Sequence, residues 1–247
     1  MKTFTSANLI TVFTYMFKGE NWQNKLLITG ALMLVSFIIP IVPMLALFGY
    51  LMKFAKNVIE GDGQPILPEW DDGRDLIRNG LKLLGLLIVF SLPLIILWIT
   101  AFGIMLSPLI LIFMDFESGN IGPNGPWTLI MLPTTIGGYF MFGLSLVIIF
   151  LQSISICHVS IKEQFSAAFH FGEWWRILRT NIGEFLLVFV VMFGLIIGTN
   201  MLSSFLFFLL PIVMPLGRAC SIFILAPLFG QAYRVGVKKL EEAEAKT

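Results

Sequence analysis

Long apolar stretches alternate with short polar segments along the whole chain. Between Lys82 and Lys162 lie 79 residues without a Lys or Arg, and between Arg179 and Arg218 lie 38 more. A membrane has a hydrocarbon core about 30 Å thick, and a helix needs about 20 apolar residues to cross it. The pattern therefore predicts an all-α, multipass helical membrane protein with about five to six membrane helices arranged in hairpins.

The Gly and Pro residues that interrupt the apolar runs give the expected boundaries of the elements. Residues Ser6–Phe17 have helical amphipathic spacing, which fits either a helix in the membrane interface or a helix packed on the bundle. Residues 238–247 are expected to be a charged soluble tail of a single integral membrane domain, residues 1–247. A turn region is expected at Glu60–Pro68, with Gly61, Gly63, Pro65 and Pro68 as breakers. The remaining expected elements are Leu81–Met114, an outer loop at Phe116–Trp127, Leu129–Ile156, an amphipathic segment His158–Asn181 with Trp174 and Trp175 at the interface, Phe185–Leu209, a turn at Pro211 and Pro215, and a return helix that includes Ile222–Tyr233.

Residues Lys25–Tyr50 allow two interpretations. They are long enough to cross the membrane once, but Pro40 and Pro43 interrupt them. The apolar arm before Pro40 would reach only about 21 Å as a helix. That length favours a short hairpin, which is either re-entrant or fully spanning, with Met44–Ile59 as its second arm.

The basic residues decide between these interpretations. If both Pro-rich turns and the loop Phe116–Trp127 face outward, 15 of the 16 basic residues face the cytoplasm, all but Arg218. A single span at residues 25–50 would move Lys2, Lys18 and Lys25 outside and leave 12 of 16. Basic residues prefer the cytoplasmic side. The sequence therefore predicts three hairpins in the cell (cytoplasmic) membrane, with both termini cytoplasmic.

Composition agrees with this assignment. The chain is 57% hydrophobic and 13% charged, whereas an ordinary soluble domain is roughly 25% charged. Its net charge of +1 argues against nucleic acid as a partner. The two cysteines, Cys157 and Cys220, are expected to be small packing residues.

Two segments share a weak internal repeat. Phe48-Gly49-Tyr50-Leu51-Met52-Lys53 follows one Pro-rich turn, and Phe229-Gly230-Gln231-Ala232-Tyr233-Arg234 follows the other. In both, a Phe-Gly pair precedes a basic residue by four positions.

The most distinctive motif is Leu67-Pro68-Glu69-Trp70-Asp71-Asp72, preceded by Gly49-Tyr50-Leu51-Met52-Lys53 and followed by Gly80-Leu81-Lys82. With Phe165–Phe169, Arg179-Thr180-Asn181 and Gly230–Arg234, this pattern resembles the archaeal and bacterial membrane proteins of domain of unknown function family 4013. Gly73 departs from the family, in which an aromatic residue is common at that position. The resemblance implies an all-helical, multipass prokaryotic membrane protein and assigns no activity, cofactor or catalytic residue.

The same motif is the best candidate for a functional site. Four acidic residues lie within one or two helical turns of three basic residues. One interpretation is therefore an N-cap at Asp71 or Asp72 with local ion pairs, with Trp70 anchored in the headgroups. A docking surface for a partner protein or a lipid headgroup is the other. The carboxylates lack a His or a Ca²⁺-loop spacing, so no metal site is predicted. The candidate residues are Pro68, Glu69, Trp70, Asp71, Asp72, Arg74, Asp75 and Arg78, with Lys82 as a further basic partner.

No other constellation suggests chemistry. His158 and His170 are expected to be interfacial without a metal role, because no motif supplies further ligands. Glu184 and Arg218 are expected at the ends of spans, which counts against an ion-coupled transporter. The sequence therefore predicts no enzyme and no cofactor. It predicts a membrane scaffold or accessory subunit that associates with the lipid bilayer, with other membrane subunits or with itself, and the alternative is a small solute transporter or channel.

Overall fold

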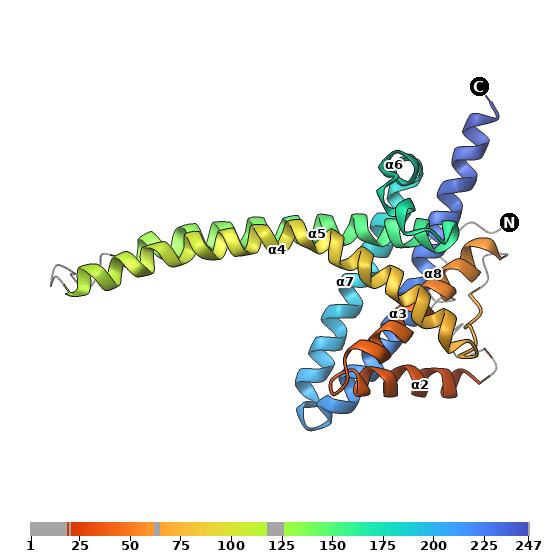
Figure 1. Ribbon diagram of the computed structural model, residues 1–247, viewed down its shortest axis with the longest axis horizontal. Coiled ribbons are helices and arrows are strands. Elements are labelled where there is room, and N and C mark those ends of the chain that lie inside the picture. The colour runs from red at the N-terminus through yellow and green to blue at the C-terminus, as the bar shows by residue number, and fades with distance from the viewer. Residues whose placement is uncertain (1–18, 20, 62–64, 118–125, 247) are drawn as a thin grey trace. The chain divides into compact units, whose positions relative to one another are not determined.

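The computed structural model describes residues 19, 21–61, 65–117 and 126–246, with side chains described outside 104–134. Within these ranges the chain forms helices and no strand, and five of the described helices are long and apolar enough to cross a membrane. The all-α, multipass prediction is confirmed, while the helix expected at Ser6–Phe17 lies outside the described residues. The helices are α2 (Trp22–Val35), α3 (Ile41–Glu60), α4 (Gly73–Glu117), α5 (Pro126–Lys162), η2 (Phe165–Phe169), α6 (Phe171–Thr180), α7 (Ile182–Phe205), η3 (Phe207–Leu209) and α8 (Leu210–Glu244) (Figure 1).

The chain forms two compact units. The first, here called the bundle unit, contains Met1–Leu86 and Ser153–Thr247, and the second, the hairpin unit, contains Leu87–Gln152. Helices α4 and α5 each contribute to both units. That the whole chain acts as one membrane domain stays a prediction.

Helix α8 is the centre of the bundle unit and packs against α2, α3, α6 and α7. Its middle part is buried on nearly every side, from Phe223 to Tyr233. A helix that is apolar all round needs neighbours on several faces. The two hairpins that precede and follow the hairpin unit therefore share one core.

The first hairpin confirms the interpretation that residues 25–50 do not form one continuous span. Helix α2 has 14 residues, and α3 begins at Ile41 directly after Pro40. Proline removes a backbone donor and fixes φ, so it is well suited to the start of a helix. The second arm begins three residues earlier than the predicted Met44, and the two helices fold back on each other (Figure 1). How deeply this hairpin enters the membrane stays a prediction.

The second hairpin corrects the sequence analysis. Its turn lies at Leu206–Leu209, and α8 already begins at Leu210, so the predicted turn at Pro211 and Pro215 is wrong. Pro211 lies in the first turn of α8, where a missing N–H costs nothing, and Pro215 is a buried residue inside the helix. As a consequence Arg218 lies inside the helix and not at the end of a span.

The charged tail was expected to be a frayed helix end, and most of it is helical. Helix α8 continues through residues 238–244. Lys239 donates a hydrogen bond from Nζ to Asn181 Oδ1 at 2.7 Å, and Arg176 pairs with Glu244. The charged end of the chain is therefore a helix tied to the start of α7 and to α6.

Helices α3 and α4 cross at two reciprocal glycines. A Cβ added to Gly49 would lie 1.8 Å from the carbonyl oxygen of Leu76, and a Cβ added to Gly80 would lie 1.8 Å from that of Leu45. Each helix contributes one leucine carbonyl and, four residues later, one glycine: Leu45 and Gly49 in α3, and Leu76 and Gly80 in α4. Each glycine lies against the leucine carbonyl of the other helix. Only glycine permits this approach. The crossing fixes the start of α4 against the first hairpin.

The segment after α5 differs from the predicted amphipathic helix His158–Asn181. Helix α5 extends to Lys162, and a break at Glu163 leads into η2 and α6. Trp174 is buried, and its Nε1 donates to the carbonyl oxygen of Ala168 at 3.2 Å, whereas Trp175 is exposed. Helix α6 therefore turns Trp174 toward its neighbours in the bundle unit, and the position of both tryptophans at the membrane interface stays a prediction.

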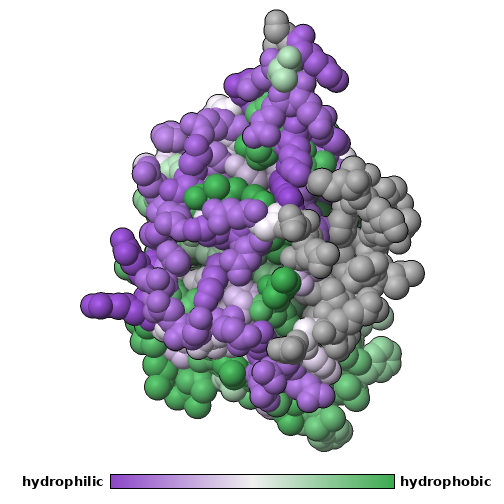
Figure 2. Space-filling view, turned by 90° about the vertical axis from the view of Figure 1, so that its right-hand side faces the viewer, coloured by the Kyte–Doolittle hydropathy of each residue, from purple (hydrophilic) through white to green (hydrophobic). Residues whose placement is uncertain are grey.

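In the hairpin unit, apolar side chains remain exposed on both helices, including Ile99 on α4 and Phe140 on α5. In the bundle unit, the turns of both hairpins are apolar and exposed as well, with Ile38 and Phe208 as the most exposed residues. Figure 2 shows a face on which hydrophilic side chains gather, with hydrophobic side chains along its lower edge. Exposed apolar surface of this extent is typical of a protein in contact with lipid or with other membrane helices.

Candidate functional site

The motif Leu67–Asp72 folds back over α3 and α2. The Tyr50 hydroxyl donates to the carbonyl oxygen of Pro68 at 3.1 Å, and the Trp70 ring stacks on the Tyr50 ring with 4.1 Å between centroids. The buried Lys25 ammonium donates to the carbonyl oxygen of Leu67 at 3.0 Å and lies 2.5 Å from the Glu69 carboxylate. The loop is therefore held by side chains from both arms of the first hairpin.

The aspartates of the motif have separate structural roles. Asp71 accepts a hydrogen bond from Lys53 Nζ at 2.6 Å, and this bond holds the pKa of Asp71 below its usual value. Asp72 Oδ1 accepts from the backbone N–H of Asp75 at 3.2 Å. That geometry satisfies a free donor at the start of α4, as an N-cap does. The predicted cap is confirmed, and Asp72 provides it.

The predicted ion pairs along α4 do not form in the described part of the chain. Glu69 and Asp71 instead pair with lysines of α2 and α3, which lie 44 and 18 residues away in sequence. Arg74 and Arg78 are exposed and make no ion pair or hydrogen bond with the four acidic residues of the motif. Local spacing predicted the wrong partners, because the fold brings distant lysines closer.

A hollow of about 420 Å³ lies beside the motif. Its wall carries five carboxylates and two lysines from α3, the motif, the start of α4 and the residue that follows α5. Lys56 bridges Glu163 and, at 3.9 Å, Glu60, and the hydrogen bond from Lys56 lowers the pKa of Glu163. Among the described residues, no group of three or more His, Cys, Asp or Glu is placed to hold a metal ion. The polar lining is Lys53, Lys56, Asn57, Glu60, Asp71, Asp72, Asp75, Asn79, Ser160 and Glu163.

Sequence reasoning missed a second polar cluster. His158 is buried, with Nδ1 2.6 Å from the Tyr233 hydroxyl and Nε2 3.3 Å from a Glu173 carboxylate oxygen. His170 is exposed, 3.7 Å from Glu173. The cluster joins α5, α6 and α8. Tyr233 lies in the motif Gly230–Arg234 named in the sequence analysis. That motif did not indicate that Tyr233 contacts His158.

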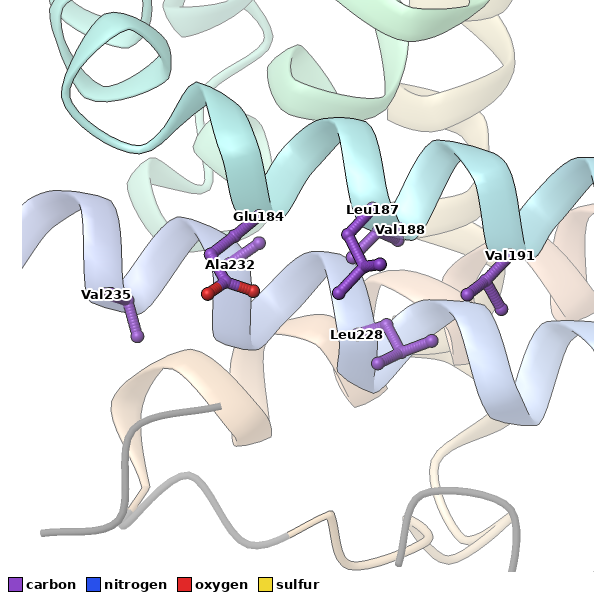
Figure 3. Close-up of a pocket in the computed structure, with 7 residues that line it drawn as sticks. All are labelled: Glu184, Leu187, Val188, Val191, Leu228, Ala232 and Val235. Carbon is purple, nitrogen blue, oxygen red and sulfur yellow. The ribbon is translucent and has the colours of Figure 1, made fainter. Parts of the chain in front are cut away.

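The packing of α7 on α8 leaves almost no internal space. Figure 3 shows a small pocket between these helices, with a volume of about 10 Å³. Such a volume holds at most about one water molecule. The lining residues are Glu184, Leu187, Val188, Val191, Leu228, Ala232 and Val235.

Comparison with known protein families confirms the resemblance that the motif suggested. The model of a family described as Protein of unknown function (DUF4013) matches residues 32–208. The chain belongs to this family. The match includes the whole Leu67–Asp72 motif and both reciprocal glycines. Neither a curated protein nor a solved structure matches the chain.

Proposed function

We propose that the chain is a non-enzymatic integral membrane scaffold or accessory subunit of a membrane protein complex. The observation that carries this proposal is that the acidic residues of the motif contact other helices of the chain. Lys25, Lys53 and the start of α4 engage Glu69, Asp71 and Asp72. The motif therefore acts as a clamp for three helices, which fits a protein that works through association.

The exposed apolar side chains support the same proposal. Val190 on α7 and Ile99 on α4 are 67% and 68% exposed, and many similar residues surround them. Lipid covers such surfaces in the membrane, and so do the helices of other subunits. The partners proposed are therefore the lipid bilayer, other membrane subunits or a second copy of the chain.

The experiment that tests this proposal is native mass spectrometry after gentle detergent extraction from the source membrane. We expect an assembly larger than the 27.7 kDa chain, of fixed stoichiometry and stable to dilution. A lone monomer would contradict the proposal.

We also propose that the protein lies in the cell membrane with both termini and the α3–α4 connection in the cytoplasm. The distribution of basic residues supports this orientation. In a cysteine-free background, single cysteines at Thr3, Gln64, Asn124 and Lys246 test it. Only the cysteine at position 124 should react with an impermeant reagent added outside, and labelling at position 3 would contradict the orientation.

The second candidate function is a small solute transporter or channel. The position of Arg218 inside α8 favours it, because ionisable groups within spans often mark transport pathways. Flux of a solute into liposomes that contain only the pure protein would support this candidate. Impermeable liposomes, together with a stable assembly in native membranes, would support the accessory subunit.

A further inference from the structure

Arg218 is a charged residue in the apolar part of a membrane helix. It lies eight residues after the start of α8, and no charged residue separates it from Arg234. With a rise of about 1.5 Å per residue, it lies about 12 Å from the turn of the second hairpin and about 24 Å from Arg234. Its side chain is exposed, and no ion pair or hydrogen bond joins it to the described part of the chain.

Asn200 on α7 lies at the same level. A Cβ added to Gly217 would lie 2.6 Å from Cγ2 of Thr199, so these two residues face each other across the hairpin. Asn200 directly follows Thr199 in α7, and Arg218 directly follows Gly217 in α8. In an antiparallel pair of right-handed helices, the residues that follow two facing residues both turn about 100° to the same side. Asn200 and Arg218 therefore share one side of the hairpin.

The Asn200 side chain is also exposed, and in the described residues its amide has no hydrogen-bond partner. A polar amide in an apolar environment costs several kcal/mol without a hydrogen bond, and a charged group costs more. A long arginine side chain can extend toward the headgroups, but an asparagine side chain is too short. Lipid alone would therefore satisfy Arg218 and leave Asn200 unpaired. Two such groups on one side and at one level favour a polar partner inside the membrane.

We infer that Asn200 and Arg218 form the docking site for a transmembrane helix of a partner subunit that carries an Asp or Glu at this depth. This inference rests on the proposed function as an accessory subunit. The carboxylate accepts two hydrogen bonds from the guanidinium, and these charge-assisted bonds are the strong ones in proteins. The Asn200 amide donates a third. The partner thereby neutralises Arg218 and satisfies Asn200 together.

A synthetic membrane helix tests the site directly. The probe is an apolar Leu/Ala helix with a single Glu about one third of its length from one end, and matched peptides carry Gln or Leu there. Purified protein and labelled peptide are placed in phosphatidylcholine liposomes, and association is measured by energy transfer. We expect the Glu peptide to bind on the order of tenfold more tightly than the Leu peptide.

Variants identify the residues responsible. Arg218→Leu should remove the preference for the Glu peptide, Asn200→Leu should reduce it, and Arg218→Lys should retain most of it. Met201→Leu is the matched control, because Met201 is exposed on another side of α7. Arg218→Leu makes the helix more apolar, so loss of binding does not reflect failed membrane insertion.

Three outcomes would overturn the inference. One is equal binding of the Glu and Leu peptides, and another is equal binding by the parent and Arg218→Leu. The third is thermal stabilisation by phosphatidylglycerol that depends on Arg218, because it would make the partner a lipid headgroup. Native mass spectrometry separates this test from that of the proposed function. If the parent and Arg218→Leu both keep a partner, only the docking site is wrong, whereas a parent without a partner contradicts the accessory-subunit proposal.

Discussion

Lys25 and Arg218 present the same physical problem in two hairpins of the bundle unit. Each is a basic residue on a largely apolar helix, and the two helices pack together, since a Cβ added to Gly30 would lie 2.9 Å from Leu216 Cδ2. Lys25 is buried against Leu67 and Glu69 from the chain's own loop. Arg218 is exposed, and no ion pair or hydrogen bond joins it to the residues that the structure describes. The comparison separates a charge that serves the fold from a charge available to a partner.

The largest effect is expected where the first hairpin is locked to α4. Gly80→Ala places a methyl group 1.8 Å from the backbone oxygen of Leu45, and a backbone cannot yield as a flexible side chain can. Overpacking of a well-packed core costs about 1–3 kcal/mol and sometimes more. We expect Gly80→Ala to lower the free energy of unfolding by about 3 kcal/mol, measured by denaturant unfolding in mild detergent, with a similar loss for Gly49→Ala.

The control for this prediction is Gly194→Ala in α7, where nothing lies within 4 Å of the added Cβ. This change should be neutral or slightly stabilising, because alanine favours the helix more than glycine does. Equal stability of the Gly80 and Gly194 variants would contradict the close crossing.

The direct comparison of the two basic residues gives the second prediction. Lys25→Met leaves the carbonyl of Leu67 and the carboxylate of Glu69 without their donor. Because the Glu69 side chain is 65% exposed, water solvates it, and we expect a loss of about 1–2 kcal/mol in the free energy of unfolding. Arg218→Leu should cause no loss in the same assay, because it breaks no described bond.

Thermal unfolding of the two variants in the same detergent checks this prediction. If Arg218→Leu destabilises the isolated chain as much as Lys25→Met does, Arg218 serves the fold and the contrast between the hairpins is lost.

Much of the fold could be predicted from local pattern. The apolar runs gave the helices, and the breakers Gly61, Pro65 and Pro68 gave the connection between α3 and α4. The turn of the second hairpin could not be found this way, because Phe205–Leu210 contains no Gly, Pro or polar residue. The nearest prolines suggested a turn, but proline also fits the first turn of a helix. That error placed Arg218 at the end of a span.

The sequence named the residues of the candidate motif but not the partners that they contact in the fold. A cap at Asp71 or Asp72 followed from N-cap preferences, which depend on neighbours in sequence, and the structure identifies Asp72. The partners of Glu69 and Asp71 are Lys25 and Lys53. Those contacts depend on how the first hairpin folds back on the loop, and local spacing contains no such information. The burial of His158 was missed for the same reason.

A smaller effect is expected at the start of α4. Asp72→Ala removes the acceptor for the Asp75 N–H and should lower the free energy of unfolding by about 1 kcal/mol. Asp72→Asn should retain most of it, because an asparagine oxygen caps as well. Protease nicking between residues 61 and 70 in membranes gives the readout. If the Ala and Asn variants are nicked equally, the cap does not stabilise this entry.

The smallest effect concerns the exposed pair of Asp71 and Lys53. The hydrogen bond from Lys53 lowers the pKa of Asp71 from its ordinary value of 3.8. A carboxyl with a lowered pKa in the folded state stabilises the fold above its unfolded pKa and loses that contribution as the pH falls through the folded pKa. Lys53 also donates to the Glu69 carbonyl oxygen at 3.3 Å, and that bond does not depend on the protonation of Asp71. Lys53→Met should therefore lower the unfolding midpoint more at pH near 7 than at a pH below the lowered folded pKa of Asp71, where its carboxyl is protonated. High salt should shrink the difference near neutral pH, because the pair is exposed.

Arg218→Leu should show no such pH dependence in the isolated chain, because no described carboxylate pairs with Arg218. A pH-dependent loss at Arg218 as large as that at Lys53 would reveal an acidic partner within the chain and remove the distinction between the two hairpins.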